Sequence, residues 1–203
     1  MSSKLKRKSK GMQPKGYSKK TLKSMSDRAK IMSNTETFFK EVVKNTQLIG
    51  YQILHDKFGF GQKRIIRLEQ TLNNTLDSVA DGVLTVVQMQ SVLLGKCGID
   101  TKEEANKVSF RERFSLVRWK INGDSYQSAG LWILDILGYY FALLGYCLKT
   151  EFKFSSNQIK KVYWHIRDYI NTLSRYKQFE LTIDMIAECL MEECKYCDSR
   201  FVN

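Results

Sequence analysis

The sequence predicts an all-α protein, folded as a compact helical bundle. From about residue 35 onward, apolar residues recur at intervals of three and four, the spacing that places them on one side of a helix. The chain of 203 residues holds a single proline, Pro14, which precedes this region and interrupts none of the expected helices. No run of residues alternates apolar and polar side chains as a strand would. With 43% hydrophobic residues, the chain is long enough to bury one ordinary core.

The N-terminal residues differ from this body in charge. Residues 1–30 hold eleven Lys or Arg and one acid, Asp27, a net charge of +10. Residues 31–203 hold 22 basic and 20 acidic residues, a net charge of +2. So polar a segment cannot bury enough apolar surface to fold alone. We therefore expect a basic, disordered, flexible arm over 1–30, followed by a single helical domain over 31–203.

This arm is expected to contact nucleic acid. Basic side chains that neutralise phosphates release condensed counterions, and a dense run of cations suits that use. A purely solubilising arm is one alternative, and docking on an acidic protein or an anionic membrane surface is another. The membrane ranks last, because no apolar anchor with bulky aromatic residues accompanies the charges. The cations expected at this interface are Lys4, Lys6, Arg7, Lys8, Lys10, Lys15, Lys19, Lys20 and Lys23.

Three helices are expected in residues 35–100. The first two are separated by the sequence FGFG at 58–61. Thr85 with Gln88 three residues later forms a capping box that opens the third helix, and Gly98 is placed to end it. The apolar stripes comprise Phe38, Phe39, Val42, Val43, Ile49, Ile53 and Leu54 in the first helix, about Glu36 to Asp56, and Ile65, Leu68, Leu72, Leu76 and Val79 in the second.

The same pattern returns 94 residues later in the chain. A three-residue insertion before Thr182 then shifts the spacing to 97. Apolar periodicity alone can agree by chance, but a shared aromatic-x-aromatic break between two helices is harder to obtain that way. We therefore expect two related three-helix units, 35–100 and 129–197. Corresponding residues include Phe58 with Phe152, Phe60 with Phe154, Thr85 with Thr182, and Cys97 with Cys194.

A linking helix is expected between the two units, over 101–123. Thr101 and Glu104 have the spacing of a capping box, and the helix should continue through about Trp119. The apolar residues that would pack this helix between the halves are Val108, Phe110, Phe114, Val117 and Ile121.

The segment FGFGQKR, 58–64, is the sharpest local candidate for a binding site. Lys63, Arg64 and Arg67 lie in the first two turns of the helix that follows, where free backbone N–H groups would also stabilise a phosphate. The alternative is that Gly59 and Gly61 only supply positive φ angles to a turn. In the second copy these glycines become Lys153 and Ser155, with Ser155 or Ser156 as the helix cap, so the turn persists without them.

The same segment carries a resemblance to known proteins. The sequence LHDKFGFGQKR, 54–64, is followed by a helix, an acidic-Gly turn and a Thr-capped helix ending near GKCGID, 95–100. This stretch resembles small helical proteins from phages and mobile elements of Gram-positive bacteria, which carry an H-acidic-x-FGFG-x-basic-Arg segment in the same context. The resemblance implies a phage or prophage origin, a host cytoplasm, and a role in regulation, replication or host takeover. It covers about fifty residues, and the basic arm and the second copy lie outside it.

No residue pattern indicates catalysis. There is no nucleophile paired with a base at a recognisable spacing and no Walker loop, so we expect neither an enzyme nor a cofactor. Cys194 and Cys197 have the spacing of half a zinc site, with Cys189 nearby, but a second pair is missing and no metal is expected. Of the aromatic residues in the second half, Tyr163 and Trp164 lie next to lysines, and either could stack on a base or belong to the core.

The leading functional hypothesis is a phage-type, non-enzymatic, cytoplasmic protein that binds nucleic acid or a nucleoprotein complex. The arm together with Lys63, Arg64 and Arg67 would supply phosphate contacts that do not depend on sequence. The alternative is a protein-binding inhibitor or adaptor that acts on a host or phage machine through its helical body. The choice between DNA and RNA, the partner, and the oligomeric state stay open at this point.

Overall fold

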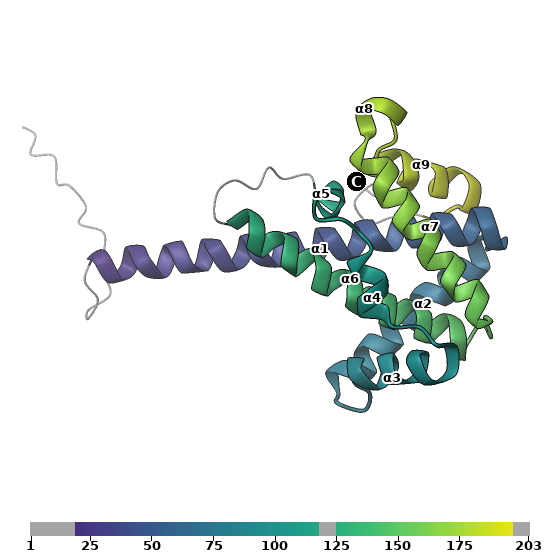
Figure 1. Ribbon diagram of the computed structural model, residues 1–203. Helices are drawn as coiled ribbons and strands as arrows, with labels where there is room; N and C mark the ends of the chain where they lie inside the picture. The colour runs from purple at the N-terminus through teal and green to yellow at the C-terminus, as the bar shows by residue number, and fades with distance from the viewer. Residues whose placement is uncertain (1–18, 118–124, 197–203) are drawn as a thin grey trace, which may run out of the picture. The chain divides into compact units, whose positions relative to one another are not determined.

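The computed structural model describes the backbone of residues 19–117 and 125–196, and the side chains of 36–117, 126–175 and 178–196. Every regular element within these ranges is a helix (Figure 1), which confirms the all-α prediction. The elements are α1 (Lys19–Phe58), α2 (Gln62–Ala80), α3 (Val86–Cys97), α4 (Thr101–Asn106), α5 (Phe110–Arg113), the 3₁₀ helix η1 (Phe114–Leu116), α6 (Ser125–Thr150), α7 (Ser156–Ser174), α8 (Tyr176–Phe179) and α9 (Ile183–Cys194).

The first helix is longer than its apolar stripe predicts. The stripe indicates a start near Glu36, but α1 begins at Lys19, inside the segment expected to be a disordered arm. The reason is local, since residues 19–36 contain neither glycine nor proline and are rich in good helix formers. The chain divides inside α1 into two units, Met1–Thr37 and Phe38–Asn203, and the hydrophobic core belongs to the second. The remainder of the expected arm, 1–18, lies outside the described residues.

The end signals of α3 are those the sequence indicates. The Thr85 hydroxyl accepts from the N–H of Gln88, and the Gln88 side chain accepts in return from the N–H of Thr85. Gly98 follows the helix with φ of 61°, in the left-handed region that glycine adopts without strain. The prediction for this helix is therefore confirmed at both ends.

The expected linking helix is wrong, because the segment 101–117 folds as several short pieces. Asp100, rather than Thr101, caps α4 by accepting from the N–H groups two and three residues further on, and the side chain of Thr101 is buried. A new capping box of Ser109 with Glu112 then starts α5. Two N-terminal caps so close together cannot belong to one continuous helix. The remainder of the expected linking helix, including Trp119 and Ile121, lies largely outside the described residues.

The second half repeats the element order of the first. Ser155 caps α7 with a capping box to Gln158, and the Thr182 hydroxyl caps α9 as Thr85 caps α3. Lys195 follows α9 with φ of 53°, the conformation that Gly98 has after α3. The additional helix α8 lies just before Thr182, where the spacing between corresponding residues of the two halves shifts from 94 to 97.

The core forms around two helices, α6 and the part of α1 that starts at Phe38 (Figure 1). These helices run in the same direction. The rings of Phe38 and Trp132, near the two starts, have centroids 6.4 Å apart, and those of Phe58 and Phe154, at and just beyond the two ends, are 5.3 Å apart. Most of the apolar stripe of α1 is buried, including Phe38, Val42 and Ile49, but Phe39 and Val43, which the stripe also placed in the core, remain exposed.

The two halves are interleaved rather than side by side. Helices α2 and α3 of the first half pack against α6 of the second. In return, the Tyr169 hydroxyl of α7 donates to Asp56 of α1 at 3.0 Å, and the ring of Tyr196, just after α9, meets that of Tyr51 at 5.2 Å. Each half therefore completes the core of the other.

Helix α6 is apolar around most of its circumference. Its stretch Tyr126–Thr150 is long enough to cross a membrane, and the most apolar 18-residue window has a mean hydropathy of 1.7, but 67% of that window is buried inside the protein. A helix surrounded by others needs no polar face, so the central position of α6 accounts for this composition. The expectation that the protein does not enter a membrane stays a prediction.

Candidate nucleic-acid interface

The three body cations predicted to bind phosphate are all exposed, but two of them have partners within the protein. The guanidinium of Arg64 lies over the ring of Phe60, 3.9 Å from its centroid. Arg67 forms an ion pair with Glu151 at 3.6 Å and lies 5.5 Å from the centroid of Phe152. Lys63 forms no ion pair with any acid in the described parts of the chain. A phosphate at the start of α2 would thus meet Lys63 first.

The two glycines of the FGFG turn have different roles. Gly59 has φ of 64°, so it needs the freedom that glycine provides. Gly61 has φ of −79° and ψ of 178°, an extended conformation open to any residue, and a side chain there would meet no neighbouring atom within 4 Å. The expectation that both glycines supply positive φ angles is therefore wrong for Gly61, which occupies the N-cap position that Ser155 fills in the second half.

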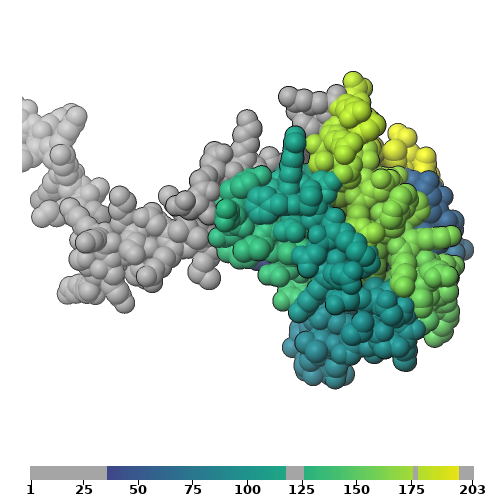
Figure 2. Space-filling view, in the orientation of Figure 1, coloured from purple at the N-terminus to yellow at the C-terminus, as the bar shows by residue number. Residues whose placement is uncertain are grey.

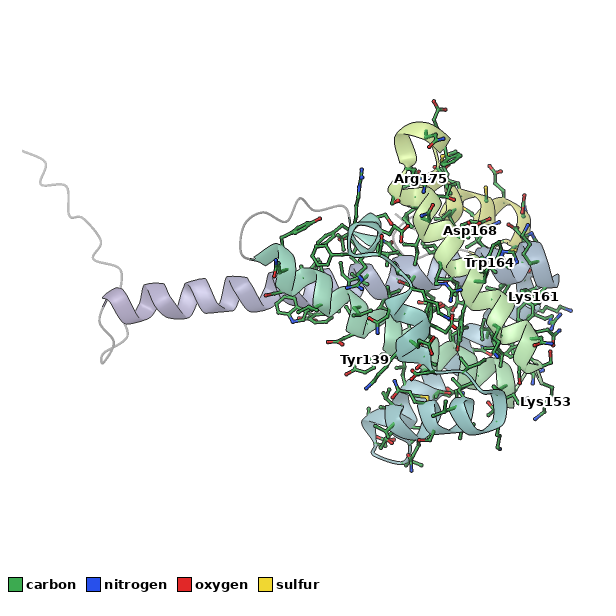
Figure 3. All side chains as sticks on the ribbon, viewed as in Figure 1. Tyr139, Lys153, Lys161, Trp164, Asp168 and Arg175 are labelled. Atoms are coloured by element: carbon green, nitrogen blue, oxygen red, sulfur yellow. The ribbon has the colours of Figure 1, made fainter. Side chains whose placement is uncertain are left out.

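The corresponding turn of the second half opens onto a different surface. Helix α7 lies along the face seen in Figure 2, where it appears in yellow-green. Its residues Lys160, Lys161 and Trp164 are exposed, and 54% of the Trp164 side chain remains accessible to solvent. Lys161, Trp164 and Asp168 follow one another along the helix in Figure 3, with Lys153 beyond its start. Exposed tryptophan is uncommon because burying its large ring is favourable, so this position is a candidate for contact with a ligand.

A lysine from α1 joins this surface. The Trp164 and His165 rings meet edge to face with centroids 4.8 Å apart. Burial lowers the pKa of His165, and the positive charges of Lys57 and Lys161 lower it further, while Asp168 opposes them. Two lysines from different helices thus act on one imidazole. We call this set of residues the Trp164 surface: Lys57, Lys160, Lys161, Trp164 and His165.

The lysines of the Trp164 surface have no anionic partner in the described parts of the chain. None of Lys57, Lys160 and Lys161 forms an ion pair there. Asp56, next to Lys57, is occupied by hydrogen bonds from Gln52 at 2.8 Å and from Tyr169. The three lysines therefore present unpaired positive charges to solvent, with the carboxylates of Asp56 and Asp168 nearby.

Comparison with protein-family models, with curated proteins and with solved structures finds no match for this chain. The geometry of the protein itself therefore carries the functional argument.

The candidate aromatic and basic residues of α7 differ in how deeply they are buried. Tyr163 is fully buried, and its hydroxyl donates to the Phe141 carbonyl at 2.5 Å, so it belongs to the core. Arg167 pairs with Glu104 of α4 and is mostly buried. Trp164 alone of the two neighbouring aromatic residues is placed to stack on a base.

The cysteines do not form a metal site within the described residues. Cys97, Cys147 and Cys194 are buried, whereas Cys189 is exposed. The sulfur of Cys194 faces the Phe60 carbonyl at 3.8 Å, and that of Cys147 faces the Thr75 hydroxyl at 3.4 Å. Cys197, the other half of the expected pair, lies outside the described residues.

One cluster with metal-binding side chains occurs in the described chain, at the end of α1. The ligand atoms of His55, Asp56 and Glu193 lie within 4.8 Å of one another. His55 donates from Nδ1 to the Phe60 carbonyl at 2.9 Å, and its Nε2 contacts a Glu193 oxygen at 2.9 Å. These contacts tie α1 to the FGFG turn and to α9, which is a sufficient structural role for the cluster without an ion.

An apolar groove lies on another part of the body. It encloses about 410 Å³ between α1, α2, α3 and α6, and Asp135 is the one charged side chain among its described lining residues. Large apolar residues stay exposed there, including Leu76 at 48% and Tyr139 at 53%. The apolar stripe predicted Leu76 to be core, but this side chain lines the groove and stays exposed, whereas Val79 beyond it packs against the core.

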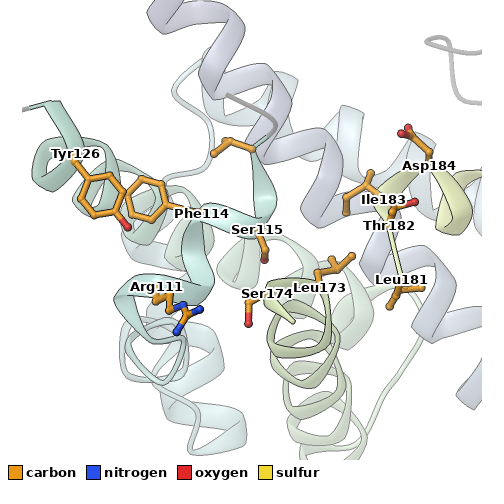
Figure 4. Close-up of a pocket in the computed structure, with 11 residues that line it drawn as sticks. Arg111, Phe114, Ser115, Tyr126, Leu173, Ser174, Leu181, Thr182, Ile183 and Asp184 are labelled. Carbon is orange, nitrogen blue, oxygen red and sulfur yellow. The ribbon is translucent and has the colours of Figure 1, made fainter. Parts of the chain in front are cut away.

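A second hollow, of about 550 Å³, lies between α5, the end of α7 and the start of α9 (Figure 4). Arg111 and Asp184 stand on opposite sides of it in that view. Residues at the ends of these helices line it, among them the apolar side chains of Phe114, Leu173 and Leu181. No cluster of catalytic side chains gathers in it among the described residues.

Sequence reasoning missed Lys57 as part of an interface. It lies in the acidic-x-FGFG stretch and has no feature that separates it from an ordinary surface lysine. It becomes part of the surface because α7 packs onto the end of α1, as the hydrogen bond from Tyr169 to Asp56 shows, which brings Lys57 near His165, the neighbour of Trp164.

Proposed function

We propose that this protein binds nucleic acid through phosphate contacts that do not depend on base sequence. The observation that carries the proposal is the positive Trp164 surface, in which Lys57, Lys160 and Lys161 face solvent without an acidic partner in the described chain. The net charge of +10 in residues 1–30 adds a second source of phosphate contacts. The body and the arm would then act on the same ligand.

The proposal extends to origin and to internal organisation. We propose a phage or mobile-element protein of a bacterial cytoplasm, on the basis of the FGFG segment, with a regulatory rather than an enzymatic role. We also infer that 35–100 and 129–197 are copies of one ancestral unit. Support for that relation comes from the repeated caps and from the positive φ angles of Gly59 and Lys153 at corresponding turns.

The test is fluorescence-anisotropy binding of labelled duplex DNA, single-stranded DNA and RNA over a range of salt concentrations. The full chain is compared with a shortened chain that starts at Ser33. We expect tight binding by the full chain whose logarithm falls linearly with the logarithm of salt concentration, with a shallower slope once the arm is removed. Absence of binding by both chains at about 50 mM salt would overturn the proposal.

The apolar groove supports a second candidate function, an adaptor or inhibitor that binds another protein. Its exposed side chains offer the apolar contact that a partner helix uses in groove recognition. Such binding should survive both high salt and removal of residues 1–32, unlike phosphate contacts. A capture experiment with Leu76→Glu separates the two functions, because this change charges the groove. Leu94→Glu, on an exposed part of α3 outside it, is the matched control.

A further inference from the structure

The two aromatic turns are related by an approximate two-fold arrangement. The ring pair Phe58 and Phe154 has centroids 5.3 Å apart at an interplanar angle of 38°. The pair Phe60 and Phe152 is the equivalent pair when the two turns are interchanged, and its centroids are 5.2 Å apart at an interplanar angle of 36°. Residues 94 apart in sequence therefore occupy matching positions around this aromatic cluster.

Under this correspondence, the two residues of an ion pair on one side of the protein match two lysines on the other side. Arg67 of α2 reaches across to Glu151 at the end of α6, at 3.6 Å. The residue 94 after Arg67 is Lys161, and the residue 94 before Glu151 is Lys57. Where one side of the protein has an ion pair, the corresponding positions of the other side hold two lysines, both of which act on His165.

The lysine side of the arrangement has no ion pair within the described chain, so its charges are available to an anion from outside. Like charges placed together oppose folding, and the opposing effect is relieved when an anion lies between or above them. Asp168 lies one turn beyond Trp164 on α7 and acts on His165, but it forms no ion pair with either lysine. Lys57 and Lys161, which form no ion pair in the described chain, thus occupy the positions that correspond to the ion pair of Glu151 with Arg67.

The exposed indole specifies what kind of anion fits. A free phosphate needs only cations and N–H donors, whereas Trp164 offers a large flat apolar surface beside them. Bases in a duplex are stacked inside the helix and do not reach such a ring, but the bases of a single strand can stack on it. Lys160 and Lys161 lie four and three residues before Trp164, so helical geometry puts their charges on the same side of α7.

We propose that the Trp164 surface binds single-stranded nucleic acid, with a base stacked on the indole of Trp164 and backbone phosphates held by Lys57 and Lys161. This inference rests on the proposed nucleic-acid binding and names the substrate class and the residues of its body site. It makes the C-terminal half of the protein, rather than the FGFG segment, the place where bases are contacted.

The test measures the binding of labelled twelve-residue oligo(dT) and oligo(rU), and of a duplex of equal length, to the full chain and its variants. Trp164→Ala should weaken binding of the single strands about tenfold and leave duplex binding nearly unchanged. Trp164→Phe keeps an aromatic ring and should restore most of the affinity. Comparison of oligo(dU) with oligo(rU), which differ only in the sugar, then identifies the preferred sugar.

Charge variants test the phosphate contacts separately. The double change Lys57→Glu and Lys161→Glu should weaken binding and make the logarithmic salt slope shallower by about 1 to 2. The double change Lys96→Glu and Lys102→Glu, at exposed positions on α3 and α4, alters the net charge by the same amount and is the matched control. Unfolding midpoints of all variants are compared, since every substituted side chain is exposed and the fold should persist.

The outcomes separate the inference from the function on which it rests. Single strands bound by the full chain but indifferent to Trp164→Ala would overturn the inference while nucleic-acid binding stands. Equal loss of duplex and single-strand binding in that variant would overturn the stacking role. No binding of any oligonucleotide by the full chain would overturn both.

Discussion

Two tyrosines of the core bury their hydroxyls in different ways. Tyr163 donates its hydroxyl proton to the Phe141 carbonyl, whereas the Tyr140 hydroxyl is buried without a hydrogen-bond partner among the described residues. Burial raises the pKa of both groups, so each stays protonated at ordinary pH. A buried polar group without a partner destabilises the folded state, and one with a partner contributes modestly.

These contacts give opposite expectations for one substitution. Tyr163→Phe should lower the free energy of unfolding by about 1 kcal/mol, since it removes a buried hydrogen bond. Tyr140→Phe should leave it unchanged or raise it by about 1 kcal/mol, because it removes an unpaired hydroxyl. Urea unfolding of both variants provides the measurement. Equal destabilisation by the two would show that Tyr140 has a partner after all.

Thiol reactivity should distinguish the exposed cysteine from the buried ones. Burial raises the pKa of Cys147 to about 11, against a smaller opposing effect of the Thr75 hydrogen bond. Its thiolate fraction at pH 8 is then about one in a thousand. Burial and then nearby glutamates also raise the pKa of Cys189, but its sulfur is reachable by reagent.

In a chain carrying Cys197→Ser, we therefore expect a disulfide reagent to modify Cys189 first, at a rate that rises with pH as the thiolate fraction grows. Cys97, Cys147 and Cys194 should react only after denaturant is added. The number of thiols released per chain over time is the readout. Labelling of Cys147 as fast as Cys189 under native conditions would mean that the core between α2 and α6 opens readily.

At the scale of the element, helix ends were the most predictable feature. A cap is a local arrangement of a side chain and a backbone N–H a few residues away, so Thr85 with Gln88 could be recognised from spacing alone. Thr101 with Glu104 has similar spacing, and it failed because Asp100 caps better and the Thr101 side chain enters the core. Local rules thus decide helix ends until burial competes for the same residue.

The matching ends of α3 and α9 offer a paired test of backbone strain. Gly98 and Lys195 both have positive φ, which costs a residue with a side chain about 1 kcal/mol. Lys195→Gly should therefore raise the free energy of unfolding, by less than about 1 kcal/mol because the unfolded chain also gains freedom. Gly98→Ala should lower it by about 1 kcal/mol.

Thermal or urea unfolding of these two variants provides the measurement, with Lys195→Ala as the control that removes the charged side chain but keeps the strain. Destabilisation by Lys195→Gly would contradict the prediction. It would mean that contacts of the Lys195 side chain outweigh the strain of its backbone.

At the scale of the whole molecule, interleaving should make the fold cooperative. Helices α2 and α3 bury their apolar faces on α6, and α7 reaches α1 through Tyr169 and Asp56. A fragment of residues 38–100 would leave those faces in water, so we expect it to be largely unfolded by far-ultraviolet circular dichroism. The full chain should unfold in one transition.

A probe in the second half and a probe of the whole chain together check this expectation. Fluorescence of Trp164, in a chain with the other tryptophans changed to Phe, and circular dichroism should give the same urea midpoint. Separate midpoints, or a folded 38–100 fragment, would show that each half is stable by itself. The interleaved contacts would then add little to the stability of the chain.

The sequence by itself determined the fold class, the order of the main helices, several helix ends and the excess positive charge. These follow from periodicity and from contacts within a few residues, which need no knowledge of the partner surface. It predicted Lys63, Arg64 and Arg67 as one site from their spacing. It could not show that Arg64 lies on Phe60 or that Arg67 pairs with Glu151.

Only the tertiary structure decided which charges remain free and which aromatic residues remain exposed. Tyr163 and Trp164 are neighbours in sequence, yet one is in the core and the other in solvent, because the position of α6 selects the buried side of α7. Lys57 and Lys161 lie far apart in the chain and act on one imidazole only because the halves interleave. Such pairings depend on long-range packing, and no local pattern in the sequence encodes them.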